Sequence, residues 1–163
     1  MTNYIDIKLY NMTESVAGLP DTVGYYDIDI DTDGDLVKED GFDTNLIMSL
    51  FCERRATRDE VSPPLMRRGW WGNTVNSDGF ELGSKLWLLD QSRLTTATVN
   101  MAQQYALQGA SWLKTDGFVK DILVDSTPTY SSNGPSIRLT ITLVRRDNEV
   151  DYKYFDVWNR TGN

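Results

Sequence analysis

The sequence contains no histidine and only one cysteine. Histidine is the side chain whose ordinary pKa lies closest to neutrality, so its absence excludes an imidazole general base, Ser–His–Asp and Cys–His catalysis, and histidine zinc sites. The single cysteine, Cys52, excludes an intramolecular disulfide and a CxxC motif. We interpret Cys52 as a small hydrophobic residue in a helix, and a lone thiol fits synthesis in a reducing cytoplasm.

Basic charge and long apolar runs are also scarce. The chain has 16 Lys and Arg against 24 Asp and Glu, a formal net charge of −8, so binding to nucleic acid is not expected. No stretch approaches the ~18 apolar residues of a membrane span, and the N-terminus lacks the basic and apolar regions of a signal peptide. No glycine-rich phosphate loop is present. The length of 163 residues fits one domain of ~100–200 residues.

Residues 51–73 hold the most unusual cluster of side chains. The letters ERR begin at Glu53, and RRGWWG begins at Arg67. Each tryptophan of the second motif can bury about 150–250 Å², and two consecutive residues cannot both point into one core from a regular element. One of Trp70 and Trp71 is therefore expected to pack inside the chain and the other against a neighbour. The sequence does not tell which.

The N-terminal region alternates between apolar and polar positions in residues 4–10 and 25–31. Period-two alternation is typical of half-buried strands. Turn-forming residues fill 11–24, which we expect to be a loop, and 32–35, which predicts a tight turn before a brief return strand at 36–37. The region is thus predicted to contain a small β-hairpin.

Helical periodicity follows. Asp43 is predicted to cap a helix over 44–54. Residues 56–69 are expected to form a long loop, a kind of segment that is often functional. The buried face of this first helix is expected to comprise Leu46, Ile47, Leu50 and Phe51.

A short helix is expected to begin near Ser84, and a long one to run over residues 96–114 with Thr95 or Thr96 as its cap. Gly117, after Asp116, is expected to end the long helix. Small and apolar residues form a stripe that permits close packing of this helix: Val99, Ala102, Ala106, Ala110 and Leu113.

The last third is predicted to be β, with strands at 118–124, 137–143 and 150–158. Turns are expected at 127–135 and 146–149. The strand at 150–158 has apolar or aromatic residues on both faces, so it is predicted to lie in the centre of the sheet or to be covered by a partner.

This order of elements indicates an α+β fold. We expect a small N-terminal β-hairpin, two to three helices including one long helix, and a C-terminal antiparallel sheet. Residues 1–163 are interpreted as a single domain, with a β region at 1–41, a helical region at 42–116 and a β region at 117–163.

Two motifs could carry chemistry. Asp29, Asp31 and Asp33, followed by glycine, match the first half of a calcium loop. An entering helix and the glutamate at position twelve are missing, so an acidic hairpin is the default interpretation and a calcium-stabilised binding module the alternative. No metal or cofactor is expected.

Glu53 could serve as the acid of a glycosidase, which needs a second carboxylate about 5–9.5 Å away. The neighbouring arginines would lower the pKa of Glu53 rather than raise it, which favours an ion pair. A lysozyme-like glycosidase remains an alternative function. The carboxylates that could approach from loops are Asp59, Glu60, Asp78 and Glu81.

Four motifs, in this order, resemble those of the Mu-like phage baseplate wedge proteins of contractile tails: LIMSLFCERRA, RRGWWGN, GSKLWLL and a helix ending in WLKTDG. The resemblance covers about residues 25–145, including the Asp-rich N-terminal segment. The family is similar, more distantly, to sheath initiators, which carry a Glu-Pro-Arg element after the first helix. Glu53-Arg54-Arg55 stands in the corresponding place here without the proline.

The resemblance implies a structural, non-enzymatic wedge subunit of the baseplate that acts as a sheath initiator. Its partners would be larger wedge proteins, the tail sheath protein, and tail tube or hub proteins, with no nucleic acid and no membrane. It would be assembled in the host cytoplasm and retained in the virion tail. Sheath initiators add C-terminal strands to a neighbour's sheet, and residues 137–158 would form that interface. The residues expected to carry the structural and partner contacts are Glu53, Arg54, Arg55, Arg68, Gly69, Trp70, Trp71, Gly72, Val150, Tyr152, Tyr154, Phe155 and Trp158.

Overall fold

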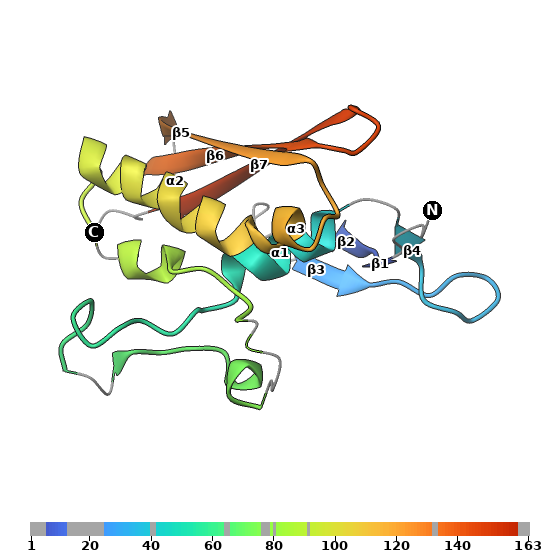
Figure 1. Cartoon of the computed structure of the whole chain (residues 1–163), viewed down its shortest axis with the longest axis horizontal. Coiled ribbons are helices and arrows are strands. Elements are labelled where there is room, and N and C mark those ends of the chain that lie inside the picture. Colours follow the sequence, from blue (N-terminus) through green and yellow to red (C-terminus); the bar gives the residue numbers. More distant parts are fainter. Residues whose placement is uncertain are drawn as a thin grey trace, which may run out of the picture. The chain divides into compact units, whose positions relative to one another are not determined.

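A computed structural model describes most of the chain, with an α+β fold (Figure 1). The chain divides into two compact units, Met1–Ile47 and Met48–Asn163, each of which is considered by itself. The boundary falls within helix α1 (Asp43–Phe51). The predicted division into three regions of one domain stays a prediction. The described residues are 6–12, 25–39, 42–63, 66–75, 79, 81–90, 92–131 and 134–159.

The first unit is built from short antiparallel strands. β1 (Asp6–Ile7) pairs with β4 (Lys38–Glu39), and β2 (Leu9–Met12) pairs with β3 (Tyr25–Ile28). The expected strand at 4–10 is therefore interrupted at Lys8, and β2 runs into the segment expected to be a loop.

The segment 29–37, which contains the acidic turn, joins β3 to β4 and is held together by a few backbone contacts. Ile30 pairs with Leu36, and the Val37 N–H donates a hydrogen bond to the Asp29 carbonyl. The Asp31 N–H also donates to the Asp35 carbonyl across this turn, whereas β3 itself pairs with β2. The sequence predicted the two strand segments and the turn, but it assigned 25–31 the wrong main partner.

Helix α1 begins one residue earlier than predicted and ends three residues earlier. It begins at Asp43, and the Phe42 carbonyl accepts the bond from the Leu46 N–H, so Phe42 holds the capping place expected of Asp43. Asp43 still lies in the first turn, where its charge suits the helix dipole. The helix ends at Phe51 because the next residues pair with other segments. Leu46 and Leu50 are buried as predicted, but Phe51 is 50% exposed.

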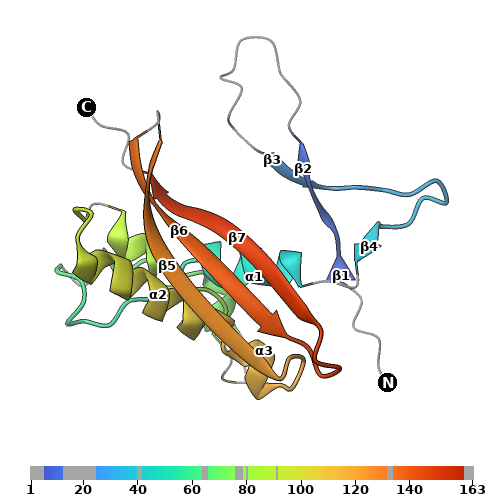
Figure 2. The ribbon, with the colours of Figure 1, turned by 90° about the horizontal axis from the view of Figure 1, so that it is seen from above.

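The second unit is organised around a three-stranded antiparallel sheet of order β5-β6-β7. Its strands are β5 (Asp121–Ser131), β6 (Gly134–Val144) and β7 (Val150–Asn159). Helix α2 (Thr96–Ala110) lies against one face of this sheet (Figure 2). The alternation predicted for residues 137–143 is confirmed, because four side chains of β6 are fully buried: Ile137, Leu139, Ile141 and Leu143.

The long turn predicted for residues 127–135 is wrong. The ladder between β5 and β6 continues from Thr127–Arg138 to Ser131–Gly134, so the reversal takes place between residues 131 and 134. Pro128 lies within β5. It is tolerated within β5 because this strand is at an edge of the sheet, where a missing N–H donor need not break a ladder.

Strand β7 lies at the other edge of the sheet rather than in its centre. Of the two alternatives weighed for this strand, the central position is therefore wrong. The turn before β7 is confirmed, since the Arg145 N–H donates to the Glu149 carbonyl and Asn148 has a positive φ of 67°.

The long helix is also segmented. The Thr98 N–H donates to the Thr95 hydroxyl, which confirms Thr95 as the cap. The predicted helix over 96–114 breaks after Ala110 and resumes as the single turn α3 (Trp112–Thr115). The predicted stripe is buried, and Gly117 ends the segment with a φ of 76°. A 3-10 helix, η3 (Leu86–Leu89), takes the place of the expected short helix.

Gly109 allows α2 to approach the Ser49 carbonyl closely. A Cβ at this position would lie 2.6 Å from the Ser49 oxygen and 3.0 Å from the Ser84 Cβ. The approach is reinforced nearby, where the Trp112 indole N–H donates to the Ser49 hydroxyl over 2.8 Å.

The substitution Gly109→Ala is therefore expected to destabilise the fold by about 1–3 kcal/mol, because the added methyl group overpacks a backbone contact. Urea unfolding would measure the loss. Asn100→Ala is the matched control, since Asn100 is exposed on the same helix and its replacement should change stability by at most about 0.5 kcal/mol. Equal stability of the two variants would contradict the packing described here.

Candidate functional site

The backbone after α1 is hydrogen-bonded on both sides, which brings the sequence motifs together. On one side, the Ser84 N–H donates to the Cys52 carbonyl, and the Arg54 N–H donates to the Ser84 carbonyl. On the other, the Trp70 N–H donates to the Glu53 carbonyl over 2.7 Å, and the Ala56 N–H donates to the Arg67 carbonyl. ERR thus lies between RRGWWG and GSKLWLL.

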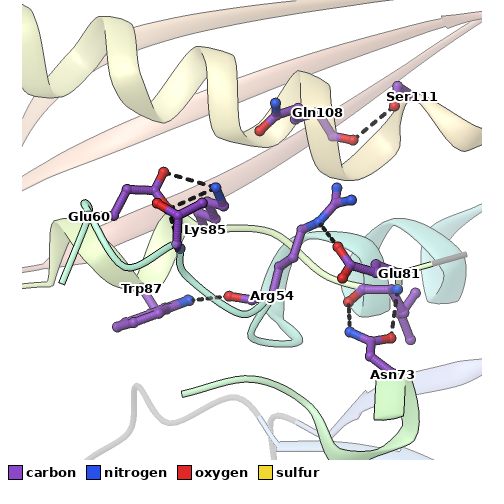
Figure 3. Close-up of polar contacts among 10 residues, drawn as sticks. Arg54, Glu60, Asn73, Glu81, Lys85, Trp87, Gln108 and Ser111 are labelled. Carbon is purple, nitrogen blue, oxygen red and sulfur yellow. Dashed lines mark hydrogen bonds and ion pairs between the residues drawn. The ribbon is translucent and has the colours of Figure 1, made fainter. Parts of the chain in front are cut away.

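The side chain of Arg54 extends this network. Its Nε lies 2.8 Å from a carboxylate oxygen of Glu81, and its backbone carbonyl accepts a bond from the Trp87 indole N–H over 2.9 Å (Figure 3). Arg55 packs against the backbone at Gly69, where its Cβ would lie 3.0 Å from an added Cβ. A glycine at position 69 is thus what lets the two segments approach.

Arg68 connects two carboxylates. Its guanidinium lies 2.7 Å from the Glu53 carboxylate and 3.6 Å from that of Asp90, and it stands 4.9 Å over the ring of Trp87. Partial burial raises the pKa of the Asp90 carboxyl, Arg68 opposes that rise, and Glu53 adds to it. Asp90 was not predicted as a site residue. Its only sequence signal is that an acidic residue directly follows the apolar run of GSKLWLL.

The two tryptophans face different surroundings, as predicted, and Trp71 is the outward one. Trp71 is 72% exposed, whereas Trp70 is partly buried and its ring lies over Gly72. The rings stack at a tilt with centroids 5.7 Å apart. The turn η2 (Trp71–Thr74) is held by Asn73, whose side chain bonds both the N–H and the carbonyl of Leu82 (Figure 3).

Two of the four carboxylates considered as partners of Glu53 pair with other residues. Glu60 pairs with Lys85 at 2.9 Å, and Glu81 pairs with Arg54. Asp59 is exposed in a turn, and Asp78 lies outside the described residues. In the part of the chain that the structure describes, the carboxylate that shares an ion-pair partner with Glu53 is Asp90.

The acidic turn uses its carboxylates as local acceptors. Asp31 accepts bonds from the backbone N–H groups of Asp33 and Asp35, and Asp29 accepts one from Ile30. Within the described part of the chain, no three acidic or thiol side chains are arranged to hold a metal ion. No described helix is long and apolar enough to cross a membrane.

The outward face of the sheet carries exposed aromatic residues at the β7 edge. Tyr152 and Tyr154 are 61% and 64% exposed. Cross-strand register places them in two rows, Leu123–Thr142–Tyr152 and Asp125–Thr140–Tyr154.

The opposite face of β7 packs inward. Val157 is buried, and the Phe155 ring meets that of Phe51 edge-on at 6.0 Å. Val150 is partly exposed at the start of the strand. Trp158 belongs to β7, but its side chain lies outside the described residues.

Gly72 is predicted to be required for the inward position of Trp70, since a Cβ there would lie 2.2 Å from the Trp70 ring. Gly72→Ala should displace the ring and destabilise the fold by about 1–3 kcal/mol. Near-ultraviolet circular dichroism would report the ring and urea unfolding the stability. Trp71→Ala is the control, because an exposed side chain should contribute at most about 0.5 kcal/mol. A larger loss for Trp71→Ala than for Gly72→Ala would reverse the assignment.

Comparison with known proteins agrees with the motif order. The family model described as Phage protein GP46 matches residues 42–150. The chain is 39% identical over 99 residues to "Baseplate protein gp46" of Escherichia phage Mu, which covers 59% of this chain and 67% of that protein. It is 33% identical over 121 residues to "Mu-like prophage FluMu protein gp46" of Haemophilus influenzae, covering 74% of this chain and 80% of that protein.

The matched region contains ERR, RRGWWG, GSKLWLL, α2 and most of the C-terminal sheet. These are the elements on which the resemblance to Mu-like baseplate proteins was based, and that resemblance is confirmed. The chain belongs to the Phage protein GP46 family.

Proposed function

We propose that this protein is a structural subunit of a contractile-tail baseplate, a wedge component that starts the sheath. It acts without catalysis and is retained in the virion after assembly in the host cytoplasm. The relatives named as baseplate or Mu-like prophage proteins support the baseplate role. The observation that carries the finer proposal is the edge position of β7 together with its exposed tyrosines.

In this proposal, a strand of another protein pairs with the exposed edge of β7. A strand at the edge of a sheet offers unpaired backbone N–H and carbonyl groups, and a partner strand satisfies them while its side chains provide specificity. Exposed Tyr152 and Tyr154 would then contact the partner on the outward face. The partner in this proposal is a strand of the tail sheath protein.

Trp71 supplies the contact to a larger wedge protein. A tryptophan that is 72% exposed leaves most of its apolar surface in water, and tryptophan is enriched among the residues that dominate binding energy at interfaces. Its backbone is held by η2 and by the Asn73–Leu82 bonds, so little ordering is needed on binding. Glu53 contributes by holding Arg68 in an ion pair rather than by acid catalysis.

The double substitution Tyr152→Lys with Tyr154→Lys is expected to prevent sheath assembly, because two charges on an edge strand oppose pairing with another strand. In a phage that encodes the protein, electron microscopy should show tubes without sheath, and the variant should still be present in the baseplate.

The matched control is Leu123→Lys with Asp125→Lys, which places the same charges in the same two rows at the β5 edge. This control should assemble sheath of normal length. Normal sheath with the tyrosine variant, or loss of sheath with both variants, would remove β7 as the site of strand addition.

Trp71→Ala is expected to reduce incorporation of the protein into baseplates while leaving its stability within about 0.5 kcal/mol of the parent chain. Mass spectrometry of purified tails would measure incorporation. Leu107→Ala is the control, because Leu107 is also exposed but lies on α2, away from the RRGWWG loop in sequence. Equal incorporation of both variants would show that Trp71 makes no such contact.

A further inference from the structure

A cavity of about 230 Å³ lies beside the ERR segment, and neither the strand-addition proposal nor the Trp71 contact uses it. Its apolar wall comes from buried side chains of three elements: Leu86 and Leu89 of η3, Ile137 of β6 and Val157 of β7. Glu53 and Asp90 also line it, and both carboxylates are partly exposed, which places them at the opening. We call this space the ERR cavity.

The size of the ERR cavity favours one side chain over a whole metabolite. Pockets for small molecules usually enclose about 300–1,000 Å³, and this one is smaller. Phe51, which is 50% exposed, forms part of the lining. An occupant that covers Phe51 would remove apolar surface from water, so an aliphatic or aromatic side chain is the fitting occupant.

The charges at the opening of the cavity determine which charge is favoured on the residue next to the bound side chain. Glu53 and Asp90 are two carboxylates served by one guanidinium, that of Arg68, so the group has an excess of one negative charge. Burial raises the pKa of the Asp90 carboxyl, Arg68 opposes that rise, and Glu53 adds to it. A second cation at this point would be attracted, and an added carboxylate would be repelled.

A second hollow, of about 560 Å³, adjoins the first and shares Trp87 and Asp90 with it. Arg68 and Met66 line this hollow, and Met66 is 63% exposed. Methionine is adaptable and recurs at peptide-binding surfaces. The shared residues place the second hollow beside the ERR cavity, where the residues next to a bound side chain would lie.

We propose that the ERR cavity and its neighbouring hollow bind a peptide segment of another protein, with an aliphatic or aromatic side chain in the cavity and an adjacent lysine or arginine at Glu53 and Asp90. The inference rests on the proposed function in one respect, namely that the segment would belong to another baseplate component. The apolar side chain of the ligand is inferred from the cavity wall and the exposed Phe51. Its adjacent cation is inferred from the excess negative charge of Glu53 and Asp90.

The test uses the full chain and three synthetic glycine–serine peptides of equal length, with Phe-Arg, Phe-Glu or Ser-Arg at the centre. The Phe-Arg peptide is expected to shift the NMR signals of the Trp87 indole and the Val157 methyl groups on titration. Replacing its Phe by Ser should weaken binding about tenfold or more, since burial of the ring is lost. Replacing Arg by Glu should also weaken it.

Asp90→Asn should weaken binding of the Phe-Arg peptide about two- to fivefold, because a partly exposed ion pair is removed, and should reduce the preference over Phe-Glu. Asp116→Asn is the matched control, an exposed aspartate in the same unit outside the lining, and should bind as the parent chain does. Three outcomes would each overturn the proposal. The Phe-Arg and Phe-Glu peptides could bind equally well, or the peptide could shift signals other than those of Trp87 and Val157. The third is that self-association of the chain produces the same shifts when no peptide is present.

Incorporation into tails separates this inference from the proposed function. If Asp90→Asn changes the peptide preference but the parent chain is absent from purified baseplates, the peptide site stands and the baseplate role fails. If the parent chain is a baseplate component and no peptide binds at the ERR cavity, the baseplate role stands and this inference fails.

Discussion

The backbone hydrogen bonds of residues 52–56 are the constraint on which the rest of the site depends. The chain leaves α1 at Phe51, and its N–H and carbonyl groups must find partners once the helix ends. Ser84 satisfies them on one side and residues 67–70 on the other. Because these bonds use backbone atoms, the side chains remain available, and Glu53 and Arg54 pair with partners from both flanking segments.

Two glycines lie at close contacts around the site. Gly109 admits the Ser49 carbonyl, and Gly72 lies under the ring of Trp70. Each glycine marks a place where a bulky group or a backbone oxygen occupies the space of a Cβ. The exposed groups of the motifs, Trp71 and the carboxylates of Glu53 and Asp90, are presented by a backbone that is already ordered, which lowers the entropy lost when a partner binds.

The sequence predicted best where one physical signal acted alone. Strict alternation identified β6, and a hydroxyl before an apolar stripe narrowed the helix cap to Thr95 or Thr96, of which Thr95 is the cap. It failed where tertiary pairing overrode local signals. Pro128 indicated a turn, yet an edge strand accommodates it. Residues 52–54 continued a helical pattern, yet long-range backbone bonds drew them out of the helix. Asp90 was missed because its proximity to Glu53 depends on Arg68, a residue from a third segment.

The same proline makes the two edges of the sheet unequal. Pro128 has no N–H group, so a strand that approached β5 from outside would meet a position without a donor. The β7 strand contains no proline. Pro128 therefore makes β5 the less favourable edge for the addition of a strand. In the strand-addition proposal, the sheet would be extended on the β7 side, opposite the strand that carries Pro128.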